Sequence, residues 1–405
     1  MIVSSTRSPE QLTTDAHAFF TEHIGGRATG VWVAPGRVNL IGDHVDYAFG
    51  VCLPFATTMA TAVAARVRED GIVRMVSHSP NGEILDAEVN LAELSTTSAE
   101  EGCLPDWRGY IAGTVHALIG GATSGLDIAV ISDVPLGSGL SSSAALECAV
   151  AVAVRDLLAP DTSDEDIIAA TMRAENHYVG ANTGGLDQNA VVRGRDGFAL
   201  ALDFLANTHE QVPCDWEGYQ LLVSDSRVEH SHVTGEYSSR RGLIDHVAAA
   251  LDCTFREDDV VERAVEWASS SETGSADLTA DSATVRRRVR HVHTETARTI
   301  DAIAALKAGD ITRFGELMNE SHVSLRDDFE IVPDALETAV QAALKAGAVG
   351  ARITGGGFGG SIIALCRVED VDVVAAAIEA DTAAQGHPTP VIYATRAQDG
   401  ARRVD

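Results

Sequence analysis

Five polar side chains lie within ten positions of the segment APGRVNLIGDHVDY, residues 34–47. They are Arg37, Asn39, Asp43, His44 and Asp46. Their spacing of a few residues sets them on one side of an irregular loop that apolar neighbours anchor. Carboxylates beside a histidine and an arginine suit bidentate recognition of a polyol such as a sugar. The alternative is a surface turn with an ion pair of its own.

The segment PLGSGLSSSAALECA, residues 135–149, indicates a strand end, a glycine–serine loop and a helix start. Gly137 and Gly139 permit positive φ and a close approach of the backbone to a ligand. Ser141, Ser142 and Ser143 place hydroxyls and N–H groups at the first turn of the helix, where unpaired donors favour an anion. The pattern predicts phosphate binding, although similar turns also occur as plain helix caps.

Lysine occurs only at Lys307 and Lys345, and neither has a glycine-rich context. A P-loop requires the pattern GxxxxGKS or GxxxxGKT, and a protein kinase requires a strand lysine that faces the nucleotide, so both architectures are excluded. Phosphate charge must then be neutralised by backbone N–H groups, arginine and a divalent cation. Mg²⁺ prefers hard oxygen ligands and keeps several waters, so one hydroxyl and one carboxylate suffice on the protein side.

Two further segments are rich in glycine. In TGGLDQNA, residues 183–190, a carboxylate follows a glycine pair just after a predicted helix. In ITGGGFGGSIIAL, residues 353–365, glycines form a turn between two predicted strands. Taken alone, the second segment is equally compatible with a tight hairpin.

Composition narrows the class of protein. The 405 residues include 59 acidic and 30 basic ones, so the net charge of −29 argues against binding to nucleic acid or anionic membranes. The six cysteines form no CxxC pair, which predicts free thiols in a reducing cytosol. No secretory segment and no run of about 20 apolar residues is present. We therefore expect a soluble cytoplasmic protein whose partners are small molecules.

The elements that must position these motifs mix strands and helices without strict βαβ alternation. Residues 126–135 alternate as a strand that leads into the serine loop, and an apolar helix over 142–158 follows. A helix is also expected over 162–182. A polar, proline-containing stretch predicts a domain boundary around residues 205–216. This mixture predicts an α+β fold rather than a doubly wound sheet.

Several of these segments, in this order, resemble the GHMP small-molecule kinases and, within them, the galactokinase family. GRVNLIGDHVDY is similar to the family's sugar signature, PLGSGLSSSAA to its phosphate loop and TGGGFGG to its third motif. GGLDQ resembles the block that carries the catalytic aspartate, and GEYSSRR and ESHVSLRDDFE extend the similarity. The resemblance covers about residues 28–366, so chance agreement is negligible.

The resemblance implies a two-domain GHMP kinase fold. The N-terminal domain, residues 1–205, would have a mixed sheet with helices of the ribosomal-S5-domain-2-like kind. The C-terminal domain, residues 216–405, would have a ferredoxin-like antiparallel sheet with helices. ATP and the sugar would meet in the cleft between them.

The resemblance also implies roles for individual residues. Asp187 would be the catalytic carboxylate that faces the anomeric hydroxyl, with Arg37 between it and the γ-phosphate. The sugar would be held by Asp43, His44, Asp46, Gly184 and Tyr237. ATP would be held by Gly137, Ser138, Gly139, Leu140, Ser141, Ser142, Ser143 and Trp107, although plain core packing would equally explain Trp107. Mg²⁺ would be held by Ser143 and Glu175.

The implied reaction is the Mg²⁺-dependent transfer of phosphate from ATP to the C1 hydroxyl of α-D-galactose. Asp43 departs from the family, because many members have glutamate there and that residue is associated with the C6 hydroxyl. A sugar-1-kinase for galactosamine, N-acetylgalactosamine, arabinose or galacturonate is therefore an alternative. A non-catalytic sensor of galactose and ATP is a second alternative, and such sensors can lack the intact Ser-Ala that Ser143 and Ala144 supply here. We expect a monomer, with a dimer as the alternative.

Overall fold

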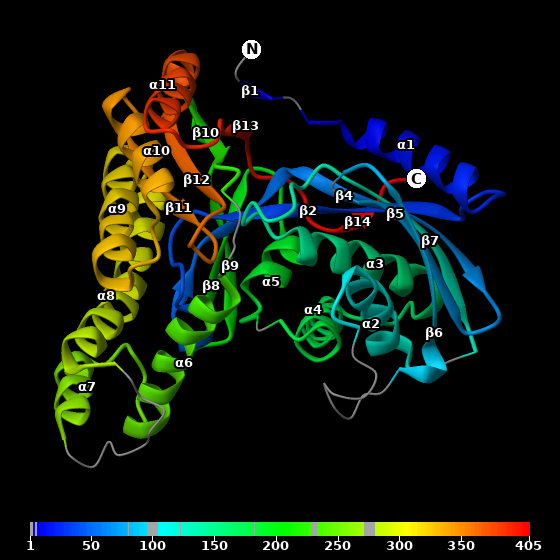
Figure 1. Cartoon of the computed structure of the whole chain (residues 1–405), viewed down its shortest axis with the longest axis horizontal. Coiled ribbons are helices and arrows are strands. Elements are labelled where there is room, and N and C mark those ends of the chain that lie inside the picture. The colour runs from blue at the N-terminus through cyan, green and yellow to red at the C-terminus, as the bar shows by residue number, and fades with distance from the viewer. Residues whose placement is uncertain are drawn as a thin grey trace.

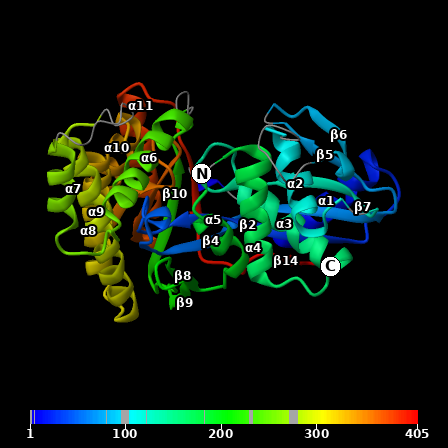
Figure 2. The same ribbon diagram turned by 90° about the horizontal axis from the view of Figure 1, so that it is seen from below.

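A computed structural model describes residues 3–4, 6–79, 81–94, 104–121, 123–181, 183–228, 233–270 and 280–405. Two β-sheets lie side by side along the long axis of the molecule, and each has helices packed against it (Figure 1, Figure 2). The predicted phosphate loop, residues 135–145, and the predicted sugar signature, residues 36–47, belong to the first half of the chain. The glycine turn at residues 355–360 belongs to the second half.

The first half is built on a mixed sheet with the strand order β14–β2–β4–β7–β5–β6. Its strands are β2 (Gly30–Asn39), β4 (Pro54–Arg68), β5 (Ile72–His78), β6 (Ile84–Asn90), β7 (Gly125–Ser132) and β14 (Arg402–Arg403). β5 runs parallel to β7, and the other neighbours are antiparallel. The mixed sheet predicted for this half is therefore confirmed.

Helices cover both faces of this sheet (Figure 1). One face carries α1 (Pro9–His23), and the other carries α2 (Trp107–Ile119), α3 (Ser142–Leu158), α4 (Asp164–Arg173) and α5 (Leu186–Arg193). Alternate residues of β2 point to opposite faces, so Val31 joins the core under α1 and Trp32 joins the core under α3. Because both faces are covered, every residue of β2 is buried.

The second half is built on a sheet with the order β1–β13–β10–β12–β11. Its strands are β1 (Val3–Ser4), β10 (Tyr219–Asp225), β11 (Gly350–Thr354), β12 (Ser361–Arg367) and β13 (Val391–Thr395). Its helices are α6 (Val233–Leu251), α7 (Val260–Ser269), α8 (Ser282–Lys307), α9 (Ile311–Ser324), α10 (Asp334–Lys345) and α11 (Val371–Ala384). Neighbouring strands are antiparallel except β1 and β13.

The segment at residues 205–216, predicted as the domain boundary, is not the only connection between the two halves in the described residues. A three-stranded sheet of β3 (Val51–Cys52), β8 (Phe198–Asp203) and β9 (Thr208–Pro213) occupies the connection. At the two ends the chain crosses over, because β1 pairs in the second sheet and β14 pairs in the first. The division into residues 1–205 and 216–405 stays a prediction.

The helix expected over residues 162–182 is divided in two. α4 ends at Arg173, and the π-helical turn η3 (Ala174–Val179) continues to Gly180, whose φ is 86°. Such wider turns often occur at functional sites, because they redirect the side chains that follow. Glu175 lies at the start of this turn. In the described residues, no helix is long and apolar enough to cross a membrane.

Candidate active site

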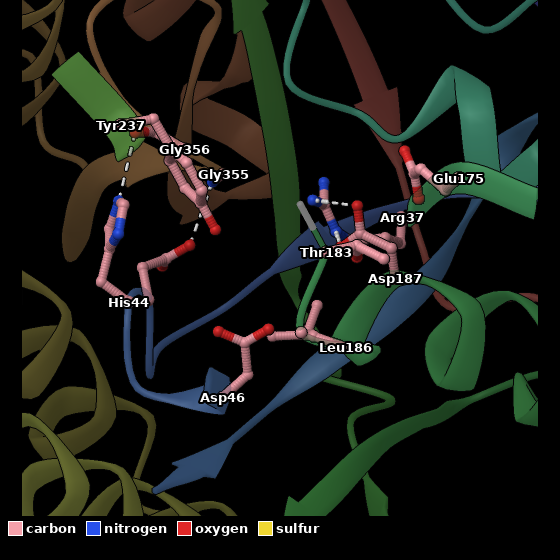
Figure 3. Close-up of a pocket in the computed structure, with 12 residues that line it drawn as sticks. Arg37, His44, Asp46, Glu175, Thr183, Leu186, Asp187, Tyr237, Gly355 and Gly356 are labelled. Carbon is pink, nitrogen blue, oxygen red and sulfur yellow. Dashed lines mark hydrogen bonds and ion pairs between the residues drawn. The ribbon is translucent and has the colours of Figure 1, made fainter. Parts of the chain in front are cut away.

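A pocket of about 200 Å³ opens between the loop after β2, the start of α5 and the glycine turn between β11 and β12 (Figure 3). Seven lining residues are those predicted as catalytic or sugar-binding, and the predicted metal ligand Glu175 is the eighth. The seven are Arg37, Asp43, His44, Asp46, Gly184, Asp187 and Tyr237. Residues 312 positions apart in the chain, such as His44 and Gly356, therefore meet in one cavity.

Arg37 and Asp187 form a bidentate ion pair on one side of this pocket (Figure 3). Nε and Nη2 of Arg37 donate to the two carboxylate oxygens of Asp187 at 2.7 and 2.8 Å. The third edge of the guanidinium donates from Nη1 to the carbonyl of Gly139 at 2.5 Å. A β-bulge between Pro35 and Arg37 shifts the register of β2 against β4, so that Arg37 pairs with Ala56 just beyond the bulge. One guanidinium therefore links the carboxylate to the phosphate loop.

The phosphate loop has the left-handed backbone that its glycines predicted. The φ angles of Gly137 and Gly139 are 73° and 75°, and Ser141 adopts a φ of 57° directly before α3. The Ser141 side chain does not cap α3, because its hydroxyl donates to Asp187. This argues against the plain-cap alternative, in which the serine would satisfy the N–H groups of the helix.

The side chains of two residues in this loop make contacts inside the protein. The Ser138 hydroxyl donates to the carbonyl of Pro135 at 2.8 Å, and the Leu140 side chain is buried. The Leu140 carbonyl also accepts from the backbone N–H of Arg37 at 3.0 Å. Ser138 and Leu140 can therefore offer a phosphate their main-chain N–H groups, but not their side chains.

Glu175 is buried beside the phosphate loop. It accepts a hydrogen bond from Nε2 of Gln188 at 2.7 Å. Burial raises the pKa of Glu175 to about 7, the nearby Asp187 carboxylate adds to the rise, and a hydrogen bond from Ser143 opposes it. Ser143 and Glu175 thus present a hydroxyl and a carboxylate to one point, which is the ligand set expected for Mg²⁺.

A further acid lies behind this pair. Glu147 on α3 has no exposed surface, and burial raises the pKa of its carboxyl group well above the ordinary value. Repulsion from Glu175 adds to that rise and the Gln188 side chain opposes it. The sequence analysis missed Glu147 and Gln188. An acid one turn after Ser143 in an otherwise apolar helix is the signal that could have identified Glu147.

The Asp46 side chain packs against Gly184 in a space that a residue with a Cβ atom would fill. The Asp46 carboxylate lies against Gly184 so closely that a Cβ atom at position 184 would be 2.0 Å from Oδ2. Burial raises the pKa of Asp46 to about 6, with a contribution from Asp187. Tyr237 on α6 faces the same carboxylate, and burial raises the pKa of its phenol, which stays a donor at neutral pH. A carboxylate and a phenol therefore face the pocket together.

His44 lines the pocket, but its ring nitrogens are engaged within the protein. Nε2 lies 3.1 Å from the carbonyl of Gly356, which can only accept, so Nε2 carries the proton. Nδ1 then accepts from the Tyr47 hydroxyl at 3.1 Å. Burial lowers the pKa of His44 to about 3. The imidazole is therefore neutral, and both of its ring nitrogens have partners within the protein.

Asp43 also lies in the pocket wall with both oxygens partnered. Oδ1 accepts from the backbone N–H of Gly355 at 3.1 Å, and Oδ2 accepts from Nη2 of Arg352. Arg352 on β11 has no exposed surface, and the sequence analysis missed it because a strand pattern does not reveal the partner of a charged residue.

A second and more apolar cavity of about 520 Å³ lies on the other side of the phosphate loop. Trp107, Ile111 and Leu146 supply flat or aliphatic surface, and Ser142 and Ser79 supply hydroxyls at its wall. Ser142 is the first residue of α3, so this cavity borders the phosphate loop. Its size and lining suit a planar heterocycle. Trp107 is thus half-buried at a cavity, not enclosed in the core.

Comparison with known proteins agrees with this geometry. The model of the GHMP kinases N terminal domain matches residues 109–195, and the model of the GHMP kinases C terminal domain matches residues 302–383. The galactokinase galactose-binding signature matches residues 18–67, which include the loop of Asp43, His44 and Asp46.

Similar proteins cover nearly the whole chain. The galactokinase of Streptomyces coelicolor is 41% identical over 95% of this chain and 97% of its own length. The galactokinase of Roseiflexus is 37% identical over 95% of both chains. The crystal structure of Lactococcus lactis galactokinase complexed with galactose matches with a TM-score of 0.83 at 30% identity, covering 96% of this chain and 99% of that one. A mevalonate kinase at 17% identity, with a TM-score of 0.62, shares the fold.

Proposed function

The chain belongs to the galactokinases of the GHMP kinase family, and on that premise we propose how its residues transfer phosphate from ATP to the C1 hydroxyl of α-D-galactose. The products are ADP and α-D-galactose 1-phosphate. The observation that carries the proposal is the Arg37–Asp187 pair, because it joins the wall of the small pocket to the phosphate loop.

Galactose occupies the 200 Å³ pocket with its anomeric hydroxyl toward Asp187. Asp187 accepts the proton of that hydroxyl, which is more acidic than an ordinary alcohol, as O1 attacks the γ-phosphorus. The bond from O1 to phosphorus forms, the bond from phosphorus to the β–γ bridging oxygen breaks, and ADP leaves. Arg37 offsets the charge that develops on the transferred group. Positioning and electrostatics supply most of the catalysis in such transfers.

The nucleotide lies along the other side of the phosphate loop. Its base enters the 520 Å³ cavity against Trp107, and its phosphates lie over the N-terminal end of α3. The main-chain N–H groups of residues 137–143 are the donors, helped by the partial positive charge of the helix end. Ser138 and Leu140 act here through their backbone only, since their side chains are engaged or buried.

The Ser143 and Glu175 side chains fit a Mg²⁺ ion that accompanies ATP. Burial and the neighbouring Asp187 carboxylate raise the pKa of Glu175 to about 7, so a cation beside it would stabilise the carboxylate form. In the described residues no cluster of three histidine, cysteine or acidic side chains could hold a metal. A Mg²⁺ ion held by Ser143 and Glu175 would take its remaining ligands from phosphate and water. When bound, Mg²⁺ neutralises phosphate charge.

A sugar panel tests the proposal. Release of ADP is measured in a coupled assay with galactose, galactosamine, N-acetylgalactosamine, arabinose and galacturonate. Galactose should give the highest kcat/KM. A higher value for another of these sugars would reassign the substrate. No turnover of any sugar, despite binding of galactose and ATP, would instead favour the sensor alternative.

The same proposal includes a monomer in the cytoplasm whose ligands are galactose and ATP. Size-exclusion chromatography with light scattering tests the oligomeric state. A single species near the chain mass of 42.6 kDa is expected.

A further inference from the structure

We infer that Arg352 is a positioning residue that sets sugar specificity through Asp43, without touching the sugar. This inference rests on the proposed function, because it assumes that galactose occupies the 200 Å³ pocket. Arg352 lies on β11, in the second half of the chain, whereas Asp43 belongs to the loop after β2 in the first half.

The ends of the pocket differ in their chemistry (Figure 3). Arg37, Asp187 and Glu175 lie together on one side, and His44, with the Gly355–Gly356 turn, lies on the other. Asp43 belongs to the second side, because Gly355 donates to its Oδ1. A sugar whose C1 hydroxyl faces Asp187 therefore turns its far edge toward Asp43.

The contacts of Asp43 leave it free to accept from a sugar hydroxyl. A carboxylate offers about four lone-pair sites. Gly355 and Arg352 each take one, at different oxygens, and the carboxylate is part of the pocket wall. Both oxygens are thus fixed in direction while acceptor capacity remains. A fixed acceptor distinguishes a hydroxyl from a hydrogen better than a mobile one does, because it cannot turn to another partner.

The contacts of Arg352 indicate that it positions Asp43 rather than filling space in the core. Its guanidinium is fully buried, and among the described residues neither Nε nor Nη1 has a hydrogen-bond partner. Its ion pair with Asp43 is the hydrogen-bonded contact that remains, and the buried Glu295 carboxylate also feels its charge. A buried charge with so few partners is costly, and an apolar side chain commonly fills such a space without loss. The residue therefore serves Asp43.

The electrostatics of the pair support this role. Burial raises the pKa of Asp43, and Glu295 adds to the rise, whereas Arg352 and Asn39 oppose it. His291 faces Asp43 from α8, with Nε2 3.1 Å from the backbone carbonyl, and burial lowers the pKa of this histidine to about 4, so it adds no charge at neutral pH. Removing Arg352 therefore removes the cation that favours the carboxylate form.

The test compares galactose with its 3-, 4- and 6-deoxy analogues in Arg352→Met, Asp43→Asn and the double variant. The unaltered protein should reject one analogue by roughly ten- to hundredfold in kcat/KM, as expected for a hydrogen bond to a charged group. Arg352→Met should reduce that ratio to within about threefold, with the KM for ATP nearly unchanged. The double variant should equal Asp43→Asn, because Arg352 acts through Asp43.

Controls separate this role from a structural one. Arg256→Met removes the arginine of another Arg–Asp pair, with Asp203, outside the pocket, and should leave the ratio unchanged. If Arg352→Met fails to fold, Arg352→Lys retains a charge without the planar fork and should give an intermediate ratio. An equal loss for all four sugars, or additive effects of the two single changes, would overturn the inference. No phosphorylation of galactose by the unaltered protein would overturn the proposed function with it.

Discussion

Replacing Asp187 by asparagine changes the chemistry of the site with the smallest change in shape. Asp187 accepts from Nε and Nη2 of Arg37, at 2.7 and 2.8 Å, and from the Ser141 hydroxyl. The amide keeps one acceptor oxygen but turns an NH₂ group toward a donor. It therefore loses the proposed proton acceptor, one arm of the bidentate pair and the charge that balances Arg37.

The magnitude follows from these contacts. Loss of a positioned base costs about 10²–10⁴ in rate, which corresponds to about 3–5 kcal/mol of transition-state stabilisation. Loss of one charge-assisted hydrogen bond costs about 1.5–3 kcal/mol of folding stability. The Arg37 and Asp187 side chains are only 8% and 23% exposed, so solvent screening reduces this cost little. We expect kcat to fall at least a hundredfold while the protein stays folded.

The assay measures kcat by coupled ADP release and follows unfolding by thermal denaturation. Galactose and ATP binding are measured separately by calorimetry and should change less than kcat does. Asp161→Asn makes the same chemical change at an exposed turn and should leave every quantity unaltered. A folded Asp187→Asn variant with kcat within tenfold of the unaltered protein would refute the assigned role.

Three further changes test the rest of the site. Ser143→Ala should weaken Mg²⁺·ATP binding by about tenfold, the value of a lost ligand or charge-assisted hydrogen bond, with less effect on galactose; calorimetry with each ligand checks this, and equal weakening of both would contradict it. Gly184→Ala brings a Cβ atom to 2.0 Å from Asp46 Oδ2, so the carboxylate must move and the KM for galactose should rise, whereas Gly242→Ala, where a Cβ meets open space, should be neutral. Because burial raises the pKa of Asp46 to about 6 and the sugar binds the ionised form, galactose affinity should improve as pH rises through about 6. Calorimetry from pH 5 to 8 measures this, and a profile for Asp46→Asn with the same inflection would assign it to another group.

The site was predictable where its signals are local. Glycines at 137 and 139 adopt positive φ, and polar residues are crowded within 34–47, so both segments stand out in the sequence. The resemblance to the galactokinase family then assigned each segment a place in the site. The bidentate geometry of Arg37 and Asp187 could not be predicted, since it depends on a bulge in β2 and on the start of α5.

Other features depend on tertiary contacts that a pattern does not contain. The role of His44 in holding the sugar stays a prediction, and the protein partners of its two ring nitrogens had no signal in the sequence. Glu147 and Arg352 are charged residues in apolar elements, where periodicity indicates burial but not the partner. The crossing of the two termini between the sheets had no signal, because β1 and β14 are only two residues long.

The phosphate loop contains no lysine, and the positive charge beside it comes from a different element. Arg37 comes from β2 and is already paired with Asp187, so it is not free to neutralise a triphosphate alone. Beside it lie Glu175 and Asp46, whose pKa values burial and neighbouring acids raise to about 7 and 6. Further negative charge is therefore costly in this pocket. On the proposed function, the positive charge that ATP needs arrives with the nucleotide, because the loop supplies dipoles and hydroxyls but no cationic side chain.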